Sequence, residues 1–460
     1  MQSNFNIFLF LFLNNRYKSS YLNNIGAYLI NAYRTNYVSE LSQSFSGKTV
    51  KIAGWVHEVR DIGNIIFLLL RDNTGIIQLT AKKGLVPENV ISSMSIPKES
   101  VISVTGTVVE NKQSKKGIEI IPTEIINLNP LQSVIPFEVT GKVPVELDVR
   151  LNYRYIDLRR LQSTAIFKIE SNVLKTFRKT VEKEGFLEIR TPSLVKEATE
   201  GGTDLFKVNY FEEEAYLAQS PQLYKQLSVI GGFDRVFMIS PVFRAEKHNT
   251  IFHLNEITQM DIEMGFADHN DVIKLLKKTV TKIIESVKKE NETDLSTLGV
   301  EIPKSKIKEI TYKKAISELN KNDVKIEYGQ DFSKEDELTL GKIFGDLLII
   351  KEYPTDIRAF YSMPNERDPR LSNSFDFIYK GLELSSGAQR IHIPELLEQA
   401  LLKRGNDPKN FEFYINAFRN GAPPHAGWSI GLERFVMRLT NSSNIRECSL
   451  FPRDRTRLVP

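Results

Sequence analysis

The chain has 460 residues, of which 41% are hydrophobic and 26% are charged, a composition typical of soluble globular proteins with two or three domains. A formal net charge of +4 permits a polyanionic partner without requiring one. The single cysteine, Cys448, excludes an internal disulfide framework and a thiolate-rich zinc site. Six scattered histidines with no HExxH spacing argue against a catalytic transition metal.

Residues 1–35 form an N-terminal extension of unusual composition, in which the apolar run IFLFLFL precedes a stretch rich in Asn and Tyr. An apolar run of this length is too short to span a bilayer. The extension also lacks the convincing pattern of a secretory signal or a transit peptide. We therefore expect it to be disordered or absent from the translated protein, and we expect a cytoplasmic protein without membrane contact.

Residues 36–130 contain short β-rich runs separated by Gly, Asn and Asp, which favour chain reversals. Five such strands predict a small barrel of the OB type. The stretch LNPLQSVIPFEVTGKVPVELDVR has three prolines and no helical period, so residues 131–155 are expected to form a linker. The predicted strands are TVKIAGWVHEV, IIFLLLRD, GIIQLTA, SVISVTGTVVE and GIEIIPTEIINL.

Residues 156–460 are expected to form a second domain with mixed helices and strands. Its first helix carries apolar residues at helical spacing and ends before Gly185, and a Lys-rich amphipathic helix is predicted at 270–290. FLEIRTP, between the helices, is expected to be a strand. The order of elements predicts an α+β fold in which an antiparallel sheet is flanked by helices. The apolar positions of the first helix are Ile166, Ile169, Val173, Phe177 and Val181.

A hairpin is predicted where VFMISPVFRAE and HLNEITQMDIEM, two alternating segments, flank the polar turn EKHNT. Arg244 and Glu246 would then lie near the turn. The planar guanidinium of Arg244 suits a phosphate or a carboxylate, because it donates two parallel hydrogen bonds. Taken alone, however, an Arg and a Glu two residues apart are more often a surface ion pair of little consequence.

From about Tyr33 onward the chain resembles the class II aminoacyl-tRNA synthetases, and specifically the aspartyl-tRNA synthetases of archaeal and eukaryotic type. The motifs that carry the resemblance occur in the expected order: GFLEIRTPSL with Pro192, FRAEKHNTIFHLNEITQMDIE, and GLERF with Arg434. AQSPQLYKQ and ELSSGAQRIH, between them, are similar to blocks of the aspartate enzymes. The resemblance implies a homodimer with an OB-type anticodon-binding barrel and a class II catalytic domain, using ATP and Mg²⁺.

The resemblance also implies the roles of individual catalytic residues. Arg244 would bridge the α-phosphate and the substrate carboxylate, Glu246 would bind the adenine amino group, and Arg434 would hold the γ-phosphate. Such a reaction needs positioning and charge neutralisation rather than a nucleophilic side chain. The expected ATP-binding residues are Arg244, Glu246, His253, Glu383 and Arg434, and the expected magnesium positions are Asp376, Glu383 and Ser386.

Amino-acid selection is expected to rest on Lys225 and Arg390, which match the positions that face the substrate side chain. Two buried cations would stay unpaired beside a neutral amide, so we expect rejection of asparagine by roughly 10⁴. Asp261 matches a residue associated with the substrate amino group, and Glu200 lies in a segment that closes over aspartate. The expected aspartate-binding set is Glu200, Ser220, Gln222, Lys225, Arg244, Asp261, Ser386 and Arg390.

Two positions depart from the family pattern. Ile257 stands where most relatives have a Phe that stacks on adenine, so the stacking is expected to be weaker or supplied elsewhere. Ala388 replaces the usual Gly in SSGAQR, which is expected to tighten the pocket floor. Neither change removes a charged catalytic group, so the predicted chemistry is unaffected.

In the barrel, Phe67, Gln78 and Glu119 match anticodon-reading positions, where an aromatic ring can stack on a base and polar groups can bind base edges. For a lone Phe in a strand, packing in the core would be the ordinary alternative. Two further positions concern the choice of tRNA and disagree: His57 is typical of enzymes that charge both tRNA(Asp) and tRNA(Asn), whereas Lys115 is typical of the strict ones. We favour the relaxed reading.

The sequence therefore predicts an aspartate–tRNA ligase. It would activate L-aspartate with ATP to aspartyl-adenylate and transfer it to the 3′ end of tRNA(Asp), with tRNA(Asn) as a second candidate. An asparagine–tRNA ligase is the first alternative, and Lys225 argues against it. A tRNA-binding paralogue without activation activity is the second, and the intact set of charged motif residues argues against that.

Overall fold

The computed structural model describes residues 32–196, 205–302 and 306–460. The first 31 residues of the expected N-terminal extension and Glu200 lie outside these ranges. The chain divides into two compact units, residues 1–135 and 136–460. Within the described ranges, no helix is both long enough and apolar enough to cross a membrane.

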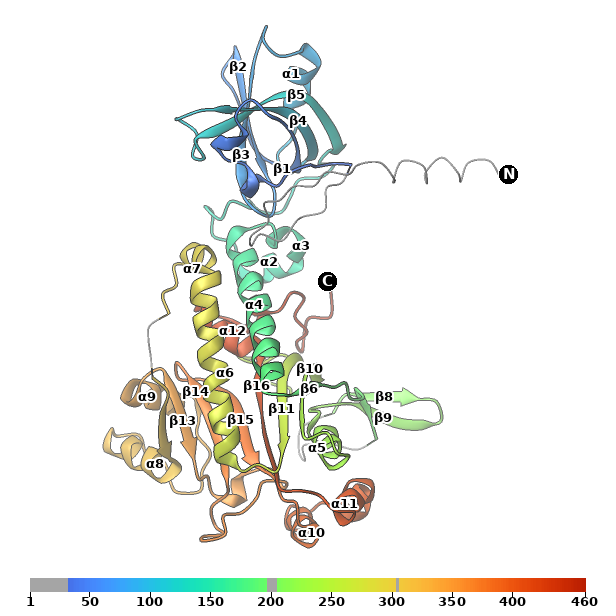
Figure 1. The fold of residues 1–460 in the computed structure, drawn as a ribbon, viewed down its shortest axis with the longest axis vertical. Helices are drawn as coiled ribbons and strands as arrows, with labels where there is room; N and C mark the ends of the chain where they lie inside the picture. Colours follow the sequence, from blue (N-terminus) through green and yellow to red (C-terminus); the bar gives the residue numbers. More distant parts are fainter. Residues whose placement is uncertain (1–31, 197–204, 303–305) are drawn as a thin grey trace. The chain divides into compact units, whose positions relative to one another are not determined.

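The first unit contains a closed five-stranded barrel, as the sequence predicted, with strand order β1-β2-β3-β5-β4 (Figure 1). Alternate residues of β2, namely Ile66, Leu68 and Leu70, are buried in the barrel core. Phe67 lies between them and points away from that core, because successive side chains of a strand face opposite sides. The elements are β1 (Thr49–Asp61), β2 (Ile65–Arg71), β3 (Ile76–Lys82), α1 (Glu88–Met94), β4 (Val101–Glu110) and β5 (Ile118–Asn129).

The second unit is built on an eight-stranded sheet. Its inner neighbours pair antiparallel, as predicted, whereas each edge pair, β12 with β13 and β10 with β6, is parallel. Only two residues of the expected FLEIRTP strand are extended, as β6. In sheet order the strands are β12 (Lys308–Thr311), β13 (Leu347–Lys351), β14 (Ser374–Tyr379), β15 (Glu383–Gln389), β16 (His425–Gly431), β11 (Glu256–Gly265), β10 (Arg235–Phe243) and β6 (Leu187–Glu188).

Two long helices, α4 (Leu161–Lys183) and α6 (His269–Glu290), cover one face of this sheet (Figure 1). Both were predicted, and α6 begins where the Asp268 side chain accepts hydrogen bonds from backbone amides of the first turn. Phe177 of α4 is fully buried and stacks edge-on against Phe237 and Trp428 of the sheet. The apolar face of the sheet is thus closed, and a functional site must lie on the other face.

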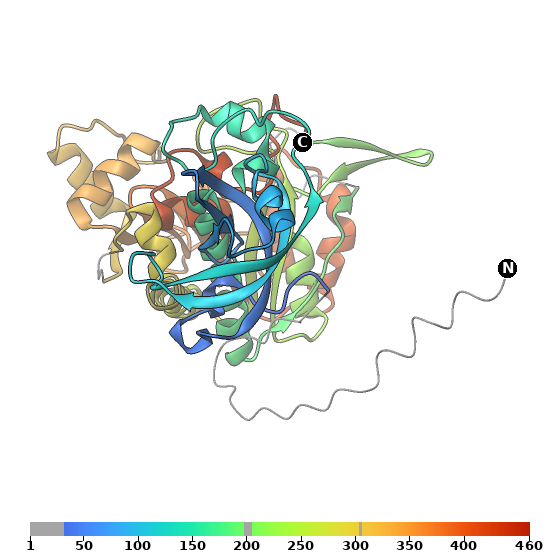
Figure 2. The ribbon, with the colours of Figure 1, turned by 90° about the horizontal axis from the view of Figure 1, so that it is seen from above.

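The remaining elements surround the edges of the sheet. The hairpin of β8 (Lys207–Tyr210) and β9 (Glu213–Leu217) projects away from it, as Figures 1 and 2 show. The segment expected as a linker is partly helical, since it contains α2 and the start of α3. Arg154 of α3 donates hydrogen bonds to three backbone carbonyls near residue 449. The other helices are α2 (Leu147–Asn152), α3 (Arg154–Asp157), α5 (Gln222–Ile230), α7 (Glu292–Leu298), α8 (Tyr312–Lys321), α9 (Lys334–Phe344), α10 (Pro394–Lys403), α11 (Glu412–Arg419) and α12 (Leu432–Thr440).

Candidate active site

A pocket of about 340 Å³ opens on the face of the sheet that α4 and α6 leave uncovered. Alternation along β11 explains its polar floor: Met260 and Ile262 enter the hydrophobic core, so Asp261 and Glu263 face the other way. Most residues singled out from the sequence line it. They are Ser220, Gln222, Lys225, Arg244, Glu246, His253, Asp261, Glu383, Ser386, Arg390 and Arg434.

Four buried charges lie at the floor of this pocket, and we call them the charge tetrad: Lys225, Asp261 and Arg390, which line the pocket, and Glu263, which pairs with both cations. The Lys225 ammonium lies 2.9 Å from Asp261 Oδ1 and 3.5 Å from Glu263 Oε2. The Arg390 guanidinium donates to both oxygens of Glu263, at 3.0 and 3.3 Å. No member is more than 4% exposed. Two positive and two negative charges therefore cancel within one dry cluster, as buried charges require.

The tetrad corrects one step of the sequence argument. Lys225 and Arg390 are already paired with Asp261 and Glu263, so they do not wait as unpaired cations for a substrate carboxylate. Burial raises the pKa of Asp261 even though Lys225 opposes the shift. The charges of Arg390 and Lys225 overcome burial at Glu263 and lower its pKa. The two cations therefore stabilise the charged form of Glu263 more strongly than that of Asp261.

A neutral hydrogen-bond network supports the tetrad from beneath. Gln226 is fully buried, and its Oε1 accepts from Gln222 Nε2 and from the Tyr414 hydroxyl, both at 2.9 Å. The side-chain NH₂ group of Gln226 must then donate to His425 Nε2, which lies 2.8 Å away. The His425 proton consequently lies on Nδ1, which donates to the Pro423 carbonyl at 2.7 Å. Burial lowers the pKa of His425, so no further positive charge adds to the tetrad.

The loop between β10 and β11 carries the groups expected to bind ATP. Asn255, the last residue of this loop, joins its two ends, because its side chain donates to the carbonyls of Arg244 and Glu246 at the start of the loop. Arg244 lies 3.7 Å from Glu246, and His253 Nε2 lies 3.9 Å from the same carboxylate. Burial, followed by the positive charges of Lys334 and Arg434, lowers the pKa of His253 to about 4. The imidazole is therefore neutral at pH 7 before an anion arrives.

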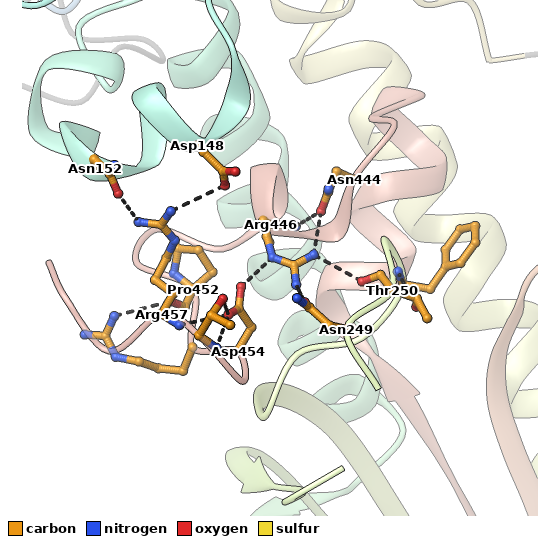
Figure 3. Close-up of polar contacts among 12 residues, drawn as sticks. Asp148, Asn152, Asn249, Thr250, Asn444, Arg446, Pro452, Asp454 and Arg457 are labelled. Carbon is orange, nitrogen blue, oxygen red and sulfur yellow. Dashed lines mark hydrogen bonds and ion pairs between the residues drawn. The ribbon is translucent and has the colours of Figure 1, made fainter. Parts of the chain in front are cut away.

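The C-terminal segment braces this loop, as Figure 3 shows. Arg446, which is 8% exposed, donates to the Thr250 carbonyl at 3.1 Å and to Asn249 Oδ1 at 2.5 Å. Its Nε donates to Asp454 Oδ2 at 2.5 Å, and Asp454 in turn accepts from nearby backbone amides. The C-terminal segment makes a second contact with the loop, because the backbone N–H of Asn255 donates to the Arg453 carbonyl. Arg446 thus fixes the position of the loop without lining the pocket.

Two of the three expected magnesium positions, Glu383 and Ser386, line the pocket, and Asp376 lies beside Ser386 in the sheet. Arg358, a residue that the sequence did not single out, contacts two of the three. Arg358 donates to both oxygens of Asp376, at 2.8 and 2.7 Å, and to Ser386 Oγ at 2.6 Å. Burial raises the pKa of Glu383 to about 8, with further contributions from Asp376 and Glu337. Glu337, whose own pKa is raised to about 7 mainly by burial, accepts the Glu383 backbone N–H at 2.8 Å.

This donor set fits Mg²⁺. Hard carboxylate oxygens are present, and burial, which raises the pKa of Glu383 and Glu337, disfavours their charged forms until a cation stabilises them. Among the described residues no group of three or more His, Cys, Asp or Glu side chains is arranged to hold a metal by itself. One or two carboxylates combined with substrate phosphates are the usual ligands of Mg²⁺, so the set suits a metal that arrives with ATP.

The two departures from the family pattern both lie in the pocket wall. Ile257 lines the pocket and packs against the hydrophobic core, so it offers an apolar surface but no ring for stacking. Ala388 is 2% exposed and lies between Ser374 and Gly427 in the sheet. The pocket has aromatic walls elsewhere, because Phe252 and Tyr361 also line it.

On the barrel, the three expected anticodon residues lie on one outer face. Phe67 is paired across the strands with Thr80. Glu119 Oε2 accepts hydrogen bonds from Thr80, from Gln78 and from Asn111, at 2.6, 2.8 and 2.8 Å. The carboxylate therefore orders a polar patch beside an aromatic ring that does not belong to the barrel core, an arrangement suited to single-stranded nucleic acid.

The two positions related to the choice of tRNA differ in environment. His57 lies at a bulge of β1, where the pairing with β2 shifts register, and its Nδ1 is 3.0 Å from the Arg71 guanidinium. Since a guanidinium only donates, Nδ1 accepts and the proton lies on Nε2. Arg71 is itself paired with buried Glu99 at 2.8 Å. Lys115, by contrast, is exposed in the loop between β4 and β5.

Each of the two units matches a known protein family. Residues 146–455 match the family described as tRNA synthetases class II (D, K and N), and residues 50–128 match the OB-fold nucleic acid binding domain. Both matches agree with the fold described above. The catalytic unit and the barrel thus belong to an aminoacyl-tRNA synthetase of class II.

Full-length relatives narrow this assignment. An aspartate–tRNA(Asp/Asn) ligase from Methanocaldococcus jannaschii is 47% identical over 430 residues, covering 93% of this chain and 98% of the relative. That of Archaeoglobus fulgidus is 46% identical over 427 residues, covering 92% and 99%. The chain therefore belongs to the aspartyl-tRNA synthetase family of class II, as the motifs predicted.

Solved structures alone would not have separated the aspartate and asparagine enzymes. The asparaginyl-tRNA synthetase from Pyrococcus horikoshii complexed with asparaginyl-adenylate has a TM-score of 0.88 at 30% identity, covering 92% of this chain and 99% of that one. The aspartyl-tRNA synthetase from Entamoeba histolytica has a TM-score of 0.83 at 33% identity, covering 92% of each chain. The difference between the two activities must lie in the pocket residues rather than in the fold.

Gly427 tests the packing of the charge tetrad. A Cβ at this position would lie 2.2 Å from Glu263 Oε2 and 2.3 Å from the Ile262 carbonyl, so Gly427→Ala should lower the free energy of unfolding by about 2 kcal/mol or more. Gly431→Ala is the matched control on the same strand, since its Cβ would meet no atom within 4 Å. Thermal and urea unfolding measure both variants, and equal stability would contradict the tight fit around Glu263.

His253 tests the electrostatics of the phosphate end. In the ligand-free protein its ring should titrate near pH 4, and bound ATP should raise that pKa, because phosphate charge stabilises the imidazolium. ATP binding should therefore strengthen as the pH falls from 7 towards 5. NMR of histidine-labelled protein gives the pKa, with His253→Gln assigning the signal. A pKa that does not move with ATP would place His253 away from the phosphates.

Proposed function

We propose that this chain is an aspartate–tRNA ligase, which activates L-aspartate with ATP and transfers it to tRNA. The observation that carries the proposal is the charge tetrad beside the ATP-binding loop. Its net charge is zero without substrate. Aspartate brings an ammonium group for Asp261 and a side-chain carboxylate for Lys225 and Arg390, so the buried cluster stays neutral when the pocket fills.

The same arithmetic opposes asparagine. Asparagine would bring the same ammonium charge, but its side chain is a neutral amide instead of a carboxylate. One positive charge among Lys225, Arg390 and the substrate would then remain uncompensated. An unbalanced charge in a site this dry is strongly unfavourable. Ser220 and Gln222 lie in the same wall and suit hydrogen bonds to the bound amino acid. Selection therefore depends on charge balance in the whole cluster rather than on one cation.

Activation follows from the geometry of the remaining pocket residues. Arg244 is positioned to neutralise both the α-phosphate and the attacking carboxylate, which would otherwise repel each other, and Glu246 to accept from the adenine amino group. His253 and Arg434 suit the outer phosphates. Glu383, together with Asp376 and Ser386, would hold Mg²⁺, which supplies positive charge to the phosphates. No side chain forms a covalent bond, so catalysis is positioning and charge stabilisation.

The barrel is proposed to bind the anticodon through Phe67, Gln78 and Glu119. We further propose relaxed selection, with both tRNA(Asp) and tRNA(Asn) as substrates. The relatives named aspartate–tRNA(Asp/Asn) ligase support this, as does His57, whose Nε2–H is fixed as a donor by Arg71. Lys115, which argued for strict selection, is exposed in the loop between β4 and β5.

A homodimer acting in the cytoplasm completes the proposal. The motif that usually forms the dimer interface of class II enzymes runs through β6, an edge strand of the catalytic sheet. Leu187 of that strand is 50% exposed, and Leu194, in the strand β7 (Leu194–Val195) of a separate three-stranded sheet, is 42% exposed. An exposed apolar sheet edge is suited to a second copy of the chain.

Exchange of pyrophosphate into ATP tests the activation step. L-Aspartate should support exchange, and L-asparagine should be poorer in kcat/KM by roughly 10⁴, because its complex leaves a buried charge unbalanced. Exchange with asparagine alone would favour an asparagine–tRNA ligase. Exchange with neither amino acid would favour a tRNA-binding protein without activation activity.

Charging assays with purified tRNA(Asp) and tRNA(Asn) test the relaxed specificity. Both tRNAs should accept aspartate at comparable kcat/KM, within about tenfold, since less than 1.4 kcal/mol separates them when no contact excludes either anticodon. A transcript with an unrelated anticodon is the control. Acceptance by tRNA(Asp) alone would contradict the relaxed reading while leaving the activation step intact.

A further inference from the structure

Lys334 is a cation that lies next to Phe252, a wall of the pocket, and the proposed function does not yet use it. It lies in the first turn of α9, in the part of the chain between β12 and β13. Its ammonium group is buried and meets no hydrogen-bond partner among the described residues. The group lies 4.2 Å from the ring centroid of Phe252, which is itself a wall of the pocket. A buried ammonium without an acceptor is costly unless a ligand supplies one.

Two further cations contact Phe252, one over its ring and the other at its backbone carbonyl. The Arg438 guanidinium lies 5.7 Å from the Phe252 centroid, and its buried Nε likewise has no hydrogen-bond partner in the described part of the chain. Arg434 Nε donates to the Phe252 carbonyl at 3.4 Å. Burial and the neighbouring charge of Arg434 lower the pKa of Lys334. Three cations around one residue leave positive charge in excess, which favours a polyanion.

The nearby acids do not remove this excess. Glu337 and Glu246 attract Lys334 electrostatically, but neither comes within the 4 Å of an ion pair with it. Glu337 accepts the Glu383 backbone N–H instead, and Glu246 is the acid nearest to Arg244. The Lys334 ammonium is therefore held beside the pocket wall with its donors unused.

We propose that Lys334 is a further binding residue for the β- and γ-phosphates of ATP and for the pyrophosphate that leaves. The inference rests on the proposed function, because it assigns Lys334 to the leaving-group end of the same reaction. Its ammonium would donate to phosphate oxygens beside Arg434 and His253. Phe252 would hold the ammonium in place through its ring face before the nucleotide binds.

A purely structural role makes a different prediction. If Lys334 only anchors α9 to Phe252, its loss should weaken all nucleotides alike and lower stability. If it binds the outer phosphates, the loss should grow with the number of phosphates beyond the first. AMP, ATP and inorganic pyrophosphate therefore separate the two roles.

The test uses Lys334→Met in the full chain, which keeps most of the apolar stem. Calorimetry in the presence of Mg²⁺ should show ATP and pyrophosphate binding weakened about tenfold or more, the usual effect of losing a charge-assisted hydrogen bond, and AMP binding changed by less than about twofold. Lys334→Arg should retain most of the affinity. Lys342→Met, an exposed position of the same helix, is the matched control and should bind all three like the wild type.

Steady-state exchange gives a second readout: KM for ATP should rise in Lys334→Met while KM for aspartate stays constant. Unchanged ATP and pyrophosphate binding would overturn the inference, and so would an equal loss for AMP. Failure of the wild type to support aspartate-dependent exchange would overturn the proposed function instead. The binding measurements would still decide the role of Lys334 in that case, because they require no amino acid.

Discussion

Charge neutrality in a dry cluster is the constraint on which the rest of this active site depends. Lys225, Asp261, Glu263 and Arg390 can remain buried only because they cancel one another. The surrounding sequence serves this requirement, since a glycine faces Glu263 and the nearest histidine is kept neutral by its hydrogen bonds. A substrate can enter only if it keeps the balance, and an amino acid with a side-chain carboxylate does so.

The two ends of the pocket are electrostatically different. At the amino-acid end each charge of the tetrad has an oppositely charged partner. At the phosphate end Lys334, Arg434 and Arg438 all contact Phe252, two of them over its ring and Arg434 at its backbone carbonyl, and leave an excess of positive charge. The first arrangement discriminates between substrates of similar size, and the second suits a highly charged leaving group common to every reaction cycle.

Much of the fold and part of the site could be predicted from the sequence. Period-two alternation located the barrel strands, helical spacing located the helix that contains Phe177, and the motifs located Lys225 and Arg390. Glu263 was missed because in MDIEM it is one polar residue of an alternating strand, and its partner Arg390 lies 127 residues away. Arg358 and Lys334 lie outside the motifs, and only tertiary contacts bring them to Asp376 and Phe252.

The brace on the ATP-binding loop has a consequence for how the enzyme folds. Arg446 and Asn249 are 197 residues apart in sequence, and closing so long a segment costs chain entropy that no local contact repays. The loop can take its working shape only after the sheet has assembled and the segment around Arg446 has docked. The shape of this loop therefore depends on contacts from far along the chain as well as on its own hydrogen bonds, so a change around Arg446 would be felt at the pocket without touching it.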